Sequence, residues 1–184
     1  MECKPRGTLI DAMHAHWFRD YSLLEEHHGY IQWLFPIREQ GMNWQSQELQ
    51  PHEANRISAD AKMRDRVLKS YEMMLHFWGM HLEDRQTGAI CRDKNWKERF
   101  RHLNRSSHNY LRITRVLKSL GELGFENLKL PFLKFILEEI IQEKTLANAQ
   151  TSCLNYWINT LRSSKELEEV RSYAREMLNR TCKY

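Results

Sequence analysis

The amino-acid sequence predicts an all-α protein, a single compact bundle of roughly seven to nine helices. Three observations support this prediction. Apolar residues recur every three to four positions along most of the chain, as on the buried face of an amphipathic helix. Seven glycines and four prolines in 184 residues are too few to punctuate many short strands. The composition, 41% hydrophobic and 28% charged, is that of a folded globular domain rather than a disordered chain.

The N-terminal part of the chain is predicted to begin with two helices. The first follows Thr8, its expected N-cap, and runs to Phe18, because apolar residues recur between them at helical spacing. Ser22 and Glu25 match the capping-box pattern and predict the start of the second helix. Gly29 is its expected C-cap, in the left-handed conformation that glycine adopts readily.

The stretch 21–43 concentrates aromatic side chains around the histidine pair His27 and His28. Large amphipathic side chains favour burial when their polar atoms find partners. One or two further helical turns are expected here, ending at Pro36 because its ring clashes with a continuing helix. The stretch therefore predicts a compact unit of helix, turn and helix.

The middle of the chain alternates loops and helices. Residues 40–51 show no period and are predicted to form a loop. A helix over 51–58 and a longer amphipathic helix over 60–78 follow, and Gly79 is the expected stop. The stretch 80–93 contains few apolar residues, so we expect an exposed loop.

The second half of the chain contains its most apolar helix. Helices are predicted over 94–103 and 111–123, and a central helix over about 131–144, which is apolar around most of its circumference. Apolar spacing predicts another helix over 154–161. The last helix is expected over 167–177, with Ser164 as its cap.

A basic stripe runs from Arg92 to Lys118, where nine cations accompany two acidic residues. Such a stripe can mark an anionic partner. Aromatic residues interleaved with the cations could stack bases, but they occur at core spacing and are expected to point inward. An alternative function is therefore a helical scaffold that binds a protein or a nucleic acid, with the protein as the favoured partner, through Arg92, Lys94, Lys97, Arg101 and Arg105.

The sequence contains no recognisable reaction centre. It lacks a nucleophile elbow, a phosphate-binding glycine-rich loop and a His-Glu-x-x-His motif. His14 and His16 are two residues apart and diverge on a helix, so they do not form a metal pair. Glu25, Glu26, His27 and His28 would suit acid and base chemistry only if they converged on an open pocket. We therefore predict a protein that is not an enzyme and uses no cofactor or metal.

The cysteines and the apolar runs indicate the compartment. The four cysteines are widely spaced, with no Cys-x-x-Cys pair, and are expected to be reduced thiols. The most apolar run, 130–141, is interrupted by charges and is too short to span a membrane. The N-terminus has no apolar secretory signal, so the chain is expected in the cytosol or nucleus.

Several long motifs resemble one known family. They are Asp20-Tyr21, His-Gly-Tyr-Ile-Gln-Trp-Leu-Phe-Pro over 28–36, Gly-Met-Asn-Trp over 41–44, Leu-Glu-Asp-Arg over 82–85 followed by Thr87-Gly88, and Asn-Tyr-Leu-Arg-Ile-Thr-Arg-Val-Leu-Lys-Ser-Leu-Gly-Glu-Leu-Gly over 109–124. In these motifs the chain resembles the conserved domain of the opioid growth factor receptor family. On this resemblance the domain is placed over 8–180.

The resemblance implies an all-helical intracellular receptor, cytoplasmic and nuclear or perinuclear, that binds the pentapeptide Met-enkephalin and slows cell proliferation. The family is unrelated to the seven-helix opioid receptors. Its members usually carry a long polar C-terminal region with targeting signals, which is not found in these 184 residues.

The ligand suggests which side chains could bind it. A zwitterionic peptide with Tyr, Phe and Met side chains needs a carboxylate, a cation and an aromatic cleft. The stretch 21–44 provides these as Glu25 and Glu26, Arg38, and Tyr30, Trp33 and Trp44. The alternative is that Tyr30, Trp33 and Phe35 simply belong to the core.

Overall fold

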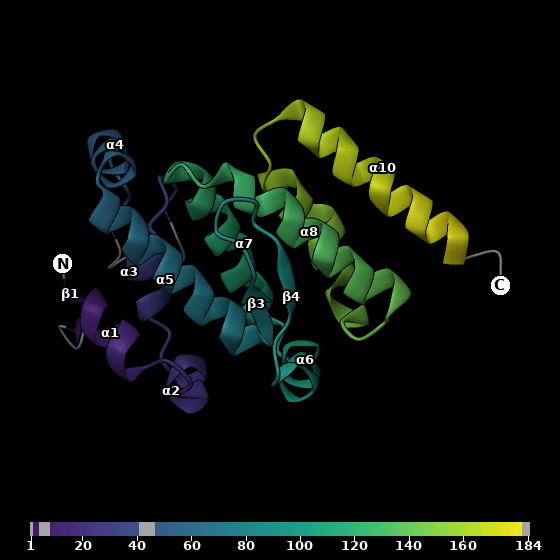
Figure 1. Ribbon diagram of the computed structural model, residues 1–184, viewed down its shortest axis with the longest axis horizontal. Helices are drawn as coiled ribbons and strands as arrows, with labels where there is room; N and C mark the ends of the chain where they lie inside the picture. The colour runs from purple at the N-terminus through teal and green to yellow at the C-terminus, as the bar shows by residue number, and fades with distance from the viewer. Residues whose placement is uncertain (1, 4–7, 41–46, 182–184) are drawn as a thin grey trace.

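The computed structural model describes residues 2–3, 8–40 and 47–181, and its fold is predominantly helical, which confirms the predicted class (Figure 1). One end of the molecule contains α1 (Ile10–His16), α2 (Tyr21–Glu26), α3 (Tyr30–Leu34) and α4 (Pro51–Ala59) around α5 (Ala61–Trp78). The rest contains α6 (Trp96–Leu103), α7 (His108–Glu122), α8 (Lys129–Leu137), α9 (Gln150–Ser152) and α10 (Ser164–Thr181). The buried apolar side chains form one contiguous cluster that extends from Met13 to Met177.

The first helices lie where they were predicted, but their caps differ. Thr8 belongs to β2 (Thr8–Leu9), which pairs with β1 (Glu2–Cys3), and Leu9 occupies the N-cap position of α1. Asp20 caps α2 by accepting a hydrogen bond from the backbone N–H of Leu23 at 3.0 Å, whereas Ser22 lies inside the helix. The predicted capping box was therefore wrong, because an aspartate two positions earlier caps the helix and places Ser22 inside its first turn.

The predicted role of Gly29 was also wrong. Its φ is −82°, so it is not left-handed, and it precedes α3 as the N-cap. The chain turns instead at His27, whose Nδ1 accepts a hydrogen bond from the N–H of Gly29 at 3.1 Å. The predicted stop of the next helix at Pro36 is confirmed, since α3 ends at Leu34.

α5 is the long helix against which the N-terminal helices pack. Asp60 caps it by accepting from the N–H of Met63 at 2.9 Å, and Gly79 ends it with a φ of +90°, as predicted. Its inward face buries Tyr71, Met74 and Trp78 among other large side chains. Because these positions repeat at helical spacing, one face of α5 contributes continuously to the core.

The stretch 80–93 is a β-hairpin, so the predicted exposed loop was wrong. β3 (Met80–Leu82) pairs antiparallel with β4 (Ile90–Arg92), with Met80 opposite Arg92 and Leu82 opposite Ile90. Met80 and Leu82 are buried, while His81 between them is exposed. This alternation is the pattern of a half-buried strand, but three residues are too few to predict it from sequence.

The predicted central helix over 131–144 corresponds to two segments. α8 begins at Lys129 and is regular to Leu137, after which η2 (Glu138–Gln142) continues as a π turn. Pro131 lies in the first turn of α8, where its missing N–H leaves no helical hydrogen bond unmade. The segment is strongly buried, as predicted, and its core side chains are Phe132, Leu133, Ile136, Leu137 and Ile140.

The predicted helix over 154–161 is replaced by short irregular turns. A 3₁₀ turn follows α8 and precedes α9, and a π turn (Cys153–Trp157) and another 3₁₀ turn (Ile158–Thr160) follow α9. Serine, threonine and asparagine are frequent here, and their side chains compete with helical hydrogen bonds. Asn159 and Thr160, for example, each donate a side-chain hydrogen bond to a backbone carbonyl.

α10 packs against α8 and η2 along one edge of the molecule (Figure 1). The hydroxyl of Ser163, not that of Ser164, accepts the hydrogen bond from the N–H of Glu166 at 3.3 Å. Val170, Ala174 and Met177 form its buried stripe. None of the helices in the described ranges is both long enough and apolar enough to cross a membrane.

Candidate functional site

A cleft of about 550 Å³ lies where α1, α3 and α4 surround the N-terminal half of α5. These four elements gather at one end of the molecule in Figure 1. The volume is within the range of roughly 300–1,000 Å³ that small-molecule and cofactor sites occupy. Its apolar lining is contributed by Ile10, Trp33, Leu34, Leu49, Ile57, Met63, Val67 and Leu123.

The sequence leaves this region thinly covered because α4 is a short helix with a small buried face. Only Ala54 of α4 is fully buried, and Ile57 is half-buried. Pro51 begins the helix, and Glu53 accepts a hydrogen bond from the N–H of Gln50 at 2.9 Å, so the start of α4 is well defined. A helix fixed at its start and sparsely packed leaves room between itself and α5.

A fixed ion pair lies on one side of the cleft. Arg66 of α5 donates two hydrogen bonds to Asp11 of α1, one of them from Nε at 2.7 Å. The hydrogen bond from Arg66 lowers the pKa of the Asp11 carboxyl below its usual value. Because each partner satisfies the other, this pair joins α1 to α5 and provides no free charge to a ligand.

A histidine and a serine lie beside that ion pair. The hydroxyl of Ser70 donates to the backbone carbonyl of Arg66 at 2.9 Å, which uses its single proton. His14 therefore donates from Nε2 to the Ser70 oxygen at 2.8 Å. Burial lowers the pKa of His14, so the ring favours its neutral form in the folded protein.

Two charges of opposite sign in the cleft have no partner among the described residues. Glu48 and Arg56 are both among the residues that line the cleft, and neither side chain forms an ion pair or hydrogen bond with a described residue. Among the described residues, this arrangement therefore combines an anion and a cation without partners and an apolar surface.

The structure does not bring together those predicted ligand residues that it describes. Trp33 lines the cleft and is half-buried. Tyr30 is fully buried, and its hydroxyl donates to the carbonyl of Leu24 at 3.1 Å, so it belongs to the core. Arg38 lies 2.8 Å from the carboxylate of Glu122. Trp44 lies outside the described residues.

Glu25 lies in a different cluster, between α2, α6 and α7. Its carboxylate is 2.8 Å from Nε2 of His108 and 3.3 Å from Nε2 of His102, and it accepts from Asn109 at 3.1 Å. Burial opposes its ionisation, but the Asn109 hydrogen bond and nearby positive charges hold its pKa below the usual range. Glu25 therefore joins three elements of the fold.

The other members of the acid and histidine group do not converge with Glu25. Glu26 is exposed. His27 accepts from Gly29, and Nδ1 of His28 lies 3.4 Å from the Arg112 guanidinium. The group lines neither the cleft nor the second cavity described below. Among the described residues no group of three or more histidines, cysteines or acids could hold a metal ion.

Most cations of the basic stripe are bound to carboxylates or backbone carbonyls within the fold. Arg92 binds Glu139 through two hydrogen bonds of 2.6 and 2.7 Å. Arg99 is buried and donates to the carbonyl of Phe77 at 2.7 Å. Three further cations bind backbone carbonyls or a carboxylate, namely Arg112, Arg115 and Lys118. Lys94, Lys97, Arg101 and Arg105 remain exposed.

Sequence reasoning missed Glu48 and Arg56 because nothing in their local pattern marks them. Glu48 lies in a segment with no period, and Arg56 is a polar residue on an exposed helix face. The available signal was the low apolar content of 51–59, which indicated that this helix covers α5 poorly. That signal predicts an opening but not which charges line it.

The fold and cleft define a predominantly helical protein with a ligand-sized cavity between its N-terminal helices, and comparison with known proteins identifies its family. The family model described as "Opioid growth factor receptor (OGFr) conserved region" matches residues 1–184. The chain therefore belongs to the opioid growth factor receptor family. No solved structure matches it.

Three relatives show how far the similarity extends. The chain is 45% identical to the rat opioid growth factor receptor and 47% identical to the mouse opioid growth factor receptor-like protein 1, each over 94% of its length. It is 41% identical to the human opioid growth factor receptor over 98% of its length. It spans between 27% and 37% of the length of these relatives, so it corresponds to one part of each.

Proposed function

We propose that this chain is the ligand-binding domain of a receptor for the opioid pentapeptide Met-enkephalin, acting in growth regulation in the cytoplasm and the nucleus or perinuclear region. The names of the relatives support a receptor of opioid growth factor. The observation that carries the location of the site is the cleft at α1, α3, α4 and α5, where Glu48 and Arg56 have no partner among the described residues.

The chemistry of the cleft suits a short zwitterionic peptide. Glu48 is available to the peptide ammonium and Arg56 to its carboxylate, and Arg can bind a carboxylate through two parallel hydrogen bonds. Trp33, Met63 and Val67 offer apolar surface to the Tyr, Phe and Met side chains of the ligand. Because five residues bury little area, binding depends on such a preformed cavity.

Isothermal titration calorimetry with Met-enkephalin tests this proposal, with a scrambled peptide as the ligand control. We expect saturable heat with the native peptide and none with the scrambled one. Glu48→Gln and Arg56→Gln should each weaken binding by about tenfold, the effect of losing roughly 1.4 kcal/mol from a charge-assisted hydrogen bond. Both side chains lack partners among the described residues, so these changes leave the fold intact.

Matched controls locate the site. Arg171→Gln and Glu176→Gln remove one charge of each sign from the exposed face of α10, and they should not change the affinity. If Glu26→Gln and Arg38→Gln abolish binding while Arg56→Gln does not, the site is the one predicted from the sequence. The absence of heat with the wild-type chain at high micromolar concentration would refute peptide binding by this domain.

A further inference from the structure

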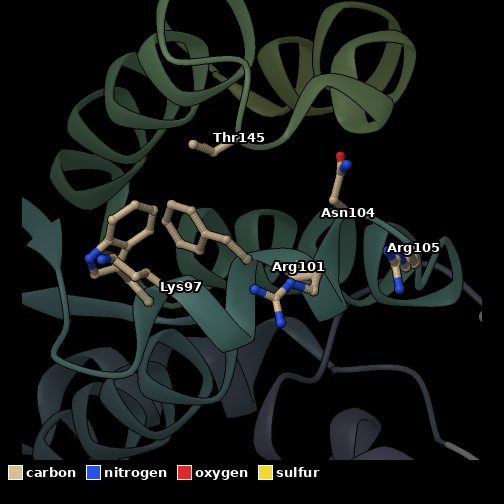
Figure 2. A pocket seen from close by; sticks show the side chains of 7 residues that line it. Lys97, Arg101, Asn104, Arg105 and Thr145 are labelled. Atoms are coloured by element: carbon tan, nitrogen blue, oxygen red, sulfur yellow. The ribbon is translucent and has the colours of Figure 1, made fainter.

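A second cavity, which we call the α6 groove, lies between α6 and the turn after η2. It has a volume of about 340 Å³ and is lined by Trp96, Lys97, Phe100, Arg101, Asn104, Arg105 and Thr145. Figure 2 shows Lys97, Arg101 and Arg105 in a row along α6 and the turn that follows it, with Thr145 across the gap. The groove is separate from the cleft proposed to bind the peptide and shares no residue with it.

The cations of this groove differ from the rest of the basic stripe. Lys97, Arg101 and Arg105 are exposed, and none of them has an acidic partner within the described ranges. Lys97 and Arg101 are four residues apart, which places them on one side of α6 about 6 Å apart along its axis. Arg105 lies in the turn that follows the helix. Nζ of Lys97 lies 5.8 Å from the centre of the Trp96 ring, but no carboxylate among the described residues neutralises any of the three cations. Three neighbouring cations repel one another, so an anion bound among them would be stabilised.

The neighbouring polar atoms also favour an anion. Oδ1 of Asn104 accepts the N–H of Asn148 at 2.9 Å, which leaves the amide Nδ2 of Asn104 as a free donor. The backbone carbonyl of Asn104 accepts from the Tyr110 hydroxyl at 3.2 Å and from Nδ2 of Asn148 at 2.9 Å. The acceptors of Asn104 are therefore occupied, and its side chain offers the groove a donor.

The aromatic residues of the groove are not free to stack bases. The guanidinium of Arg92 lies 4.2 Å from the centre of the Trp96 ring, and Phe100 contacts Trp96 edge-on with ring centres 5.6 Å apart. Phe100 itself is 1% exposed. Sequence-independent binding of single-stranded nucleic acid relies on open aromatic faces on which bases stack, and the groove provides none. Three cations neutralise few phosphates compared with the roughly 6–10 contacts of a typical duplex-binding protein.

We propose that the α6 groove binds a phosphorylated side chain on a peptide segment of a partner protein. A phosphate monoester carries nearly two negative charges and three acceptor oxygens, which match two arginines, a lysine and an amide donor better than a single carboxylate does. Arg101 and Arg105 would hold the phosphate through paired hydrogen bonds, and Lys97 would add a point charge. The proposal does not depend on binding of the opioid peptide.

A peptide array provides the test. Its peptides carry a central phosphoserine with randomised flanks, and each has an unphosphorylated duplicate. We expect the chain to retain a subset of phosphopeptides at least about tenfold more strongly than their duplicates. In solution, the best phosphopeptide should shift the NMR signals of Trp96, Lys97 and Arg101, and its affinity should exceed that of inorganic phosphate by about tenfold or more.

Charge-matched variants control this experiment. Lys97→Gln, Arg101→Gln and Arg105→Gln combined should lose the retained peptides, whereas Lys62→Gln, Lys165→Gln and Arg171→Gln combined, which remove three exposed cations elsewhere, should keep them. Far-UV circular dichroism confirms that both variants fold. Equal affinity for inorganic phosphate and phosphopeptide, tighter binding of a thymidine oligonucleotide, or equal retention of phosphorylated and unphosphorylated peptides would each overturn the proposal.

Discussion

At the scale of single residues, two glycines with similar backbone angles have different surroundings. Gly79 has a φ of +90° and Gly124 a φ of +79°, so both occupy the left-handed region that other residues avoid. A Cβ at Gly79 would lie 2.9 Å from Cβ of Arg99 and 3.0 Å from Cα of Trp96. A Cβ at Gly124 would meet its nearest neighbours at 3.4 Å, an ordinary contact distance.

This difference predicts unequal effects of alanine. Gly124→Ala should lower the free energy of unfolding by about 1 kcal/mol, the cost of left-handed backbone for a residue with a Cβ. Gly79→Ala should lower it by about 3 kcal/mol, because overpacking against the start of α6 adds to the same backbone cost. Urea denaturation of the two variants checks this, and equal losses would show that α6 moves to absorb the extra atom.

At the scale of elements, the hairpin is joined to the C-terminal half by a buried carboxylate. Arg92 of β4 forms a bidentate pair with Glu139 of η2, and the hydroxyl of Thr145 donates to the same carboxylate at 2.7 Å. Glu139 is only 3% exposed. The stability of a buried carboxylate depends on its partners. Removing the arginine would leave the carboxylate desolvated and without an opposite charge, which costs free energy.

Arg92→Ala should therefore destabilise the protein by about 3 kcal/mol. The matched control is Arg85, which binds Glu72 with similar geometry, at 2.6 and 2.8 Å, but on the surface. Arg85→Ala should lose no more than about 1 kcal/mol, since water solvates the carboxylate that is left. Unfolding free energies from urea titration distinguish the two, and a loss at Arg85 as large as that at Arg92 would contradict the role of burial.

Patterns longer than about two helical turns could be predicted from the sequence, whereas shorter ones could not. α5 and its stop at Gly79 were predicted correctly, because eighteen residues repeat one amphipathic stripe. β3 and the irregular turns over 147–160 were not, since their local signals are weak and their partners lie far along the chain. Trp157, for example, donates its indole N–H to the carbonyl of Tyr110 at 3.1 Å.

At the scale of the whole molecule, the apolar cluster is continuous from α1 to α10, so we infer that residues 8–180 fold as one domain. Three partly buried histidines should make the free energy of unfolding of this domain depend on pH. They are His14 in α1, His76 in α5 and His102 in α6, and burial lowers the pKa of each. In the unfolded chain these rings regain their ordinary pKa of about 6.5.

The pH dependence of stability follows from this difference. Below about pH 6.5 the unfolded chain binds protons that the folded protein does not, so the free energy of unfolding should fall between about pH 7.5 and 5.5. Carboxylates with lowered pKa values, such as that of Glu25, remain ionised over this range and contribute at lower pH.

Urea titrations at about pH 7.5 and 5.5 measure this decrease in the free energy of unfolding. The decrease should become smaller in His14→Gln and in His102→Gln, and it should be unchanged in His16→Gln, which alters an exposed histidine of α1. A free energy of unfolding that stays constant or rises as the pH falls would contradict the assignment of neutral buried rings.

The sequence by itself determined the all-α class, the long amphipathic helices and the family, because each depends on a pattern that extends over many neighbouring residues. Only the tertiary structure decided which charged side chains are buried or paired and which remain exposed. The basic stripe from Arg92 to Lys118 looks uniform in sequence, yet the fold buries or pairs five of its nine cations and leaves four exposed, three of which line the α6 groove. Likewise Glu48 and Arg56 become a candidate ligand pair through the placement of α4 on α5. Burial and pairing depend on residues distant in the chain, and local pattern carries no information about them.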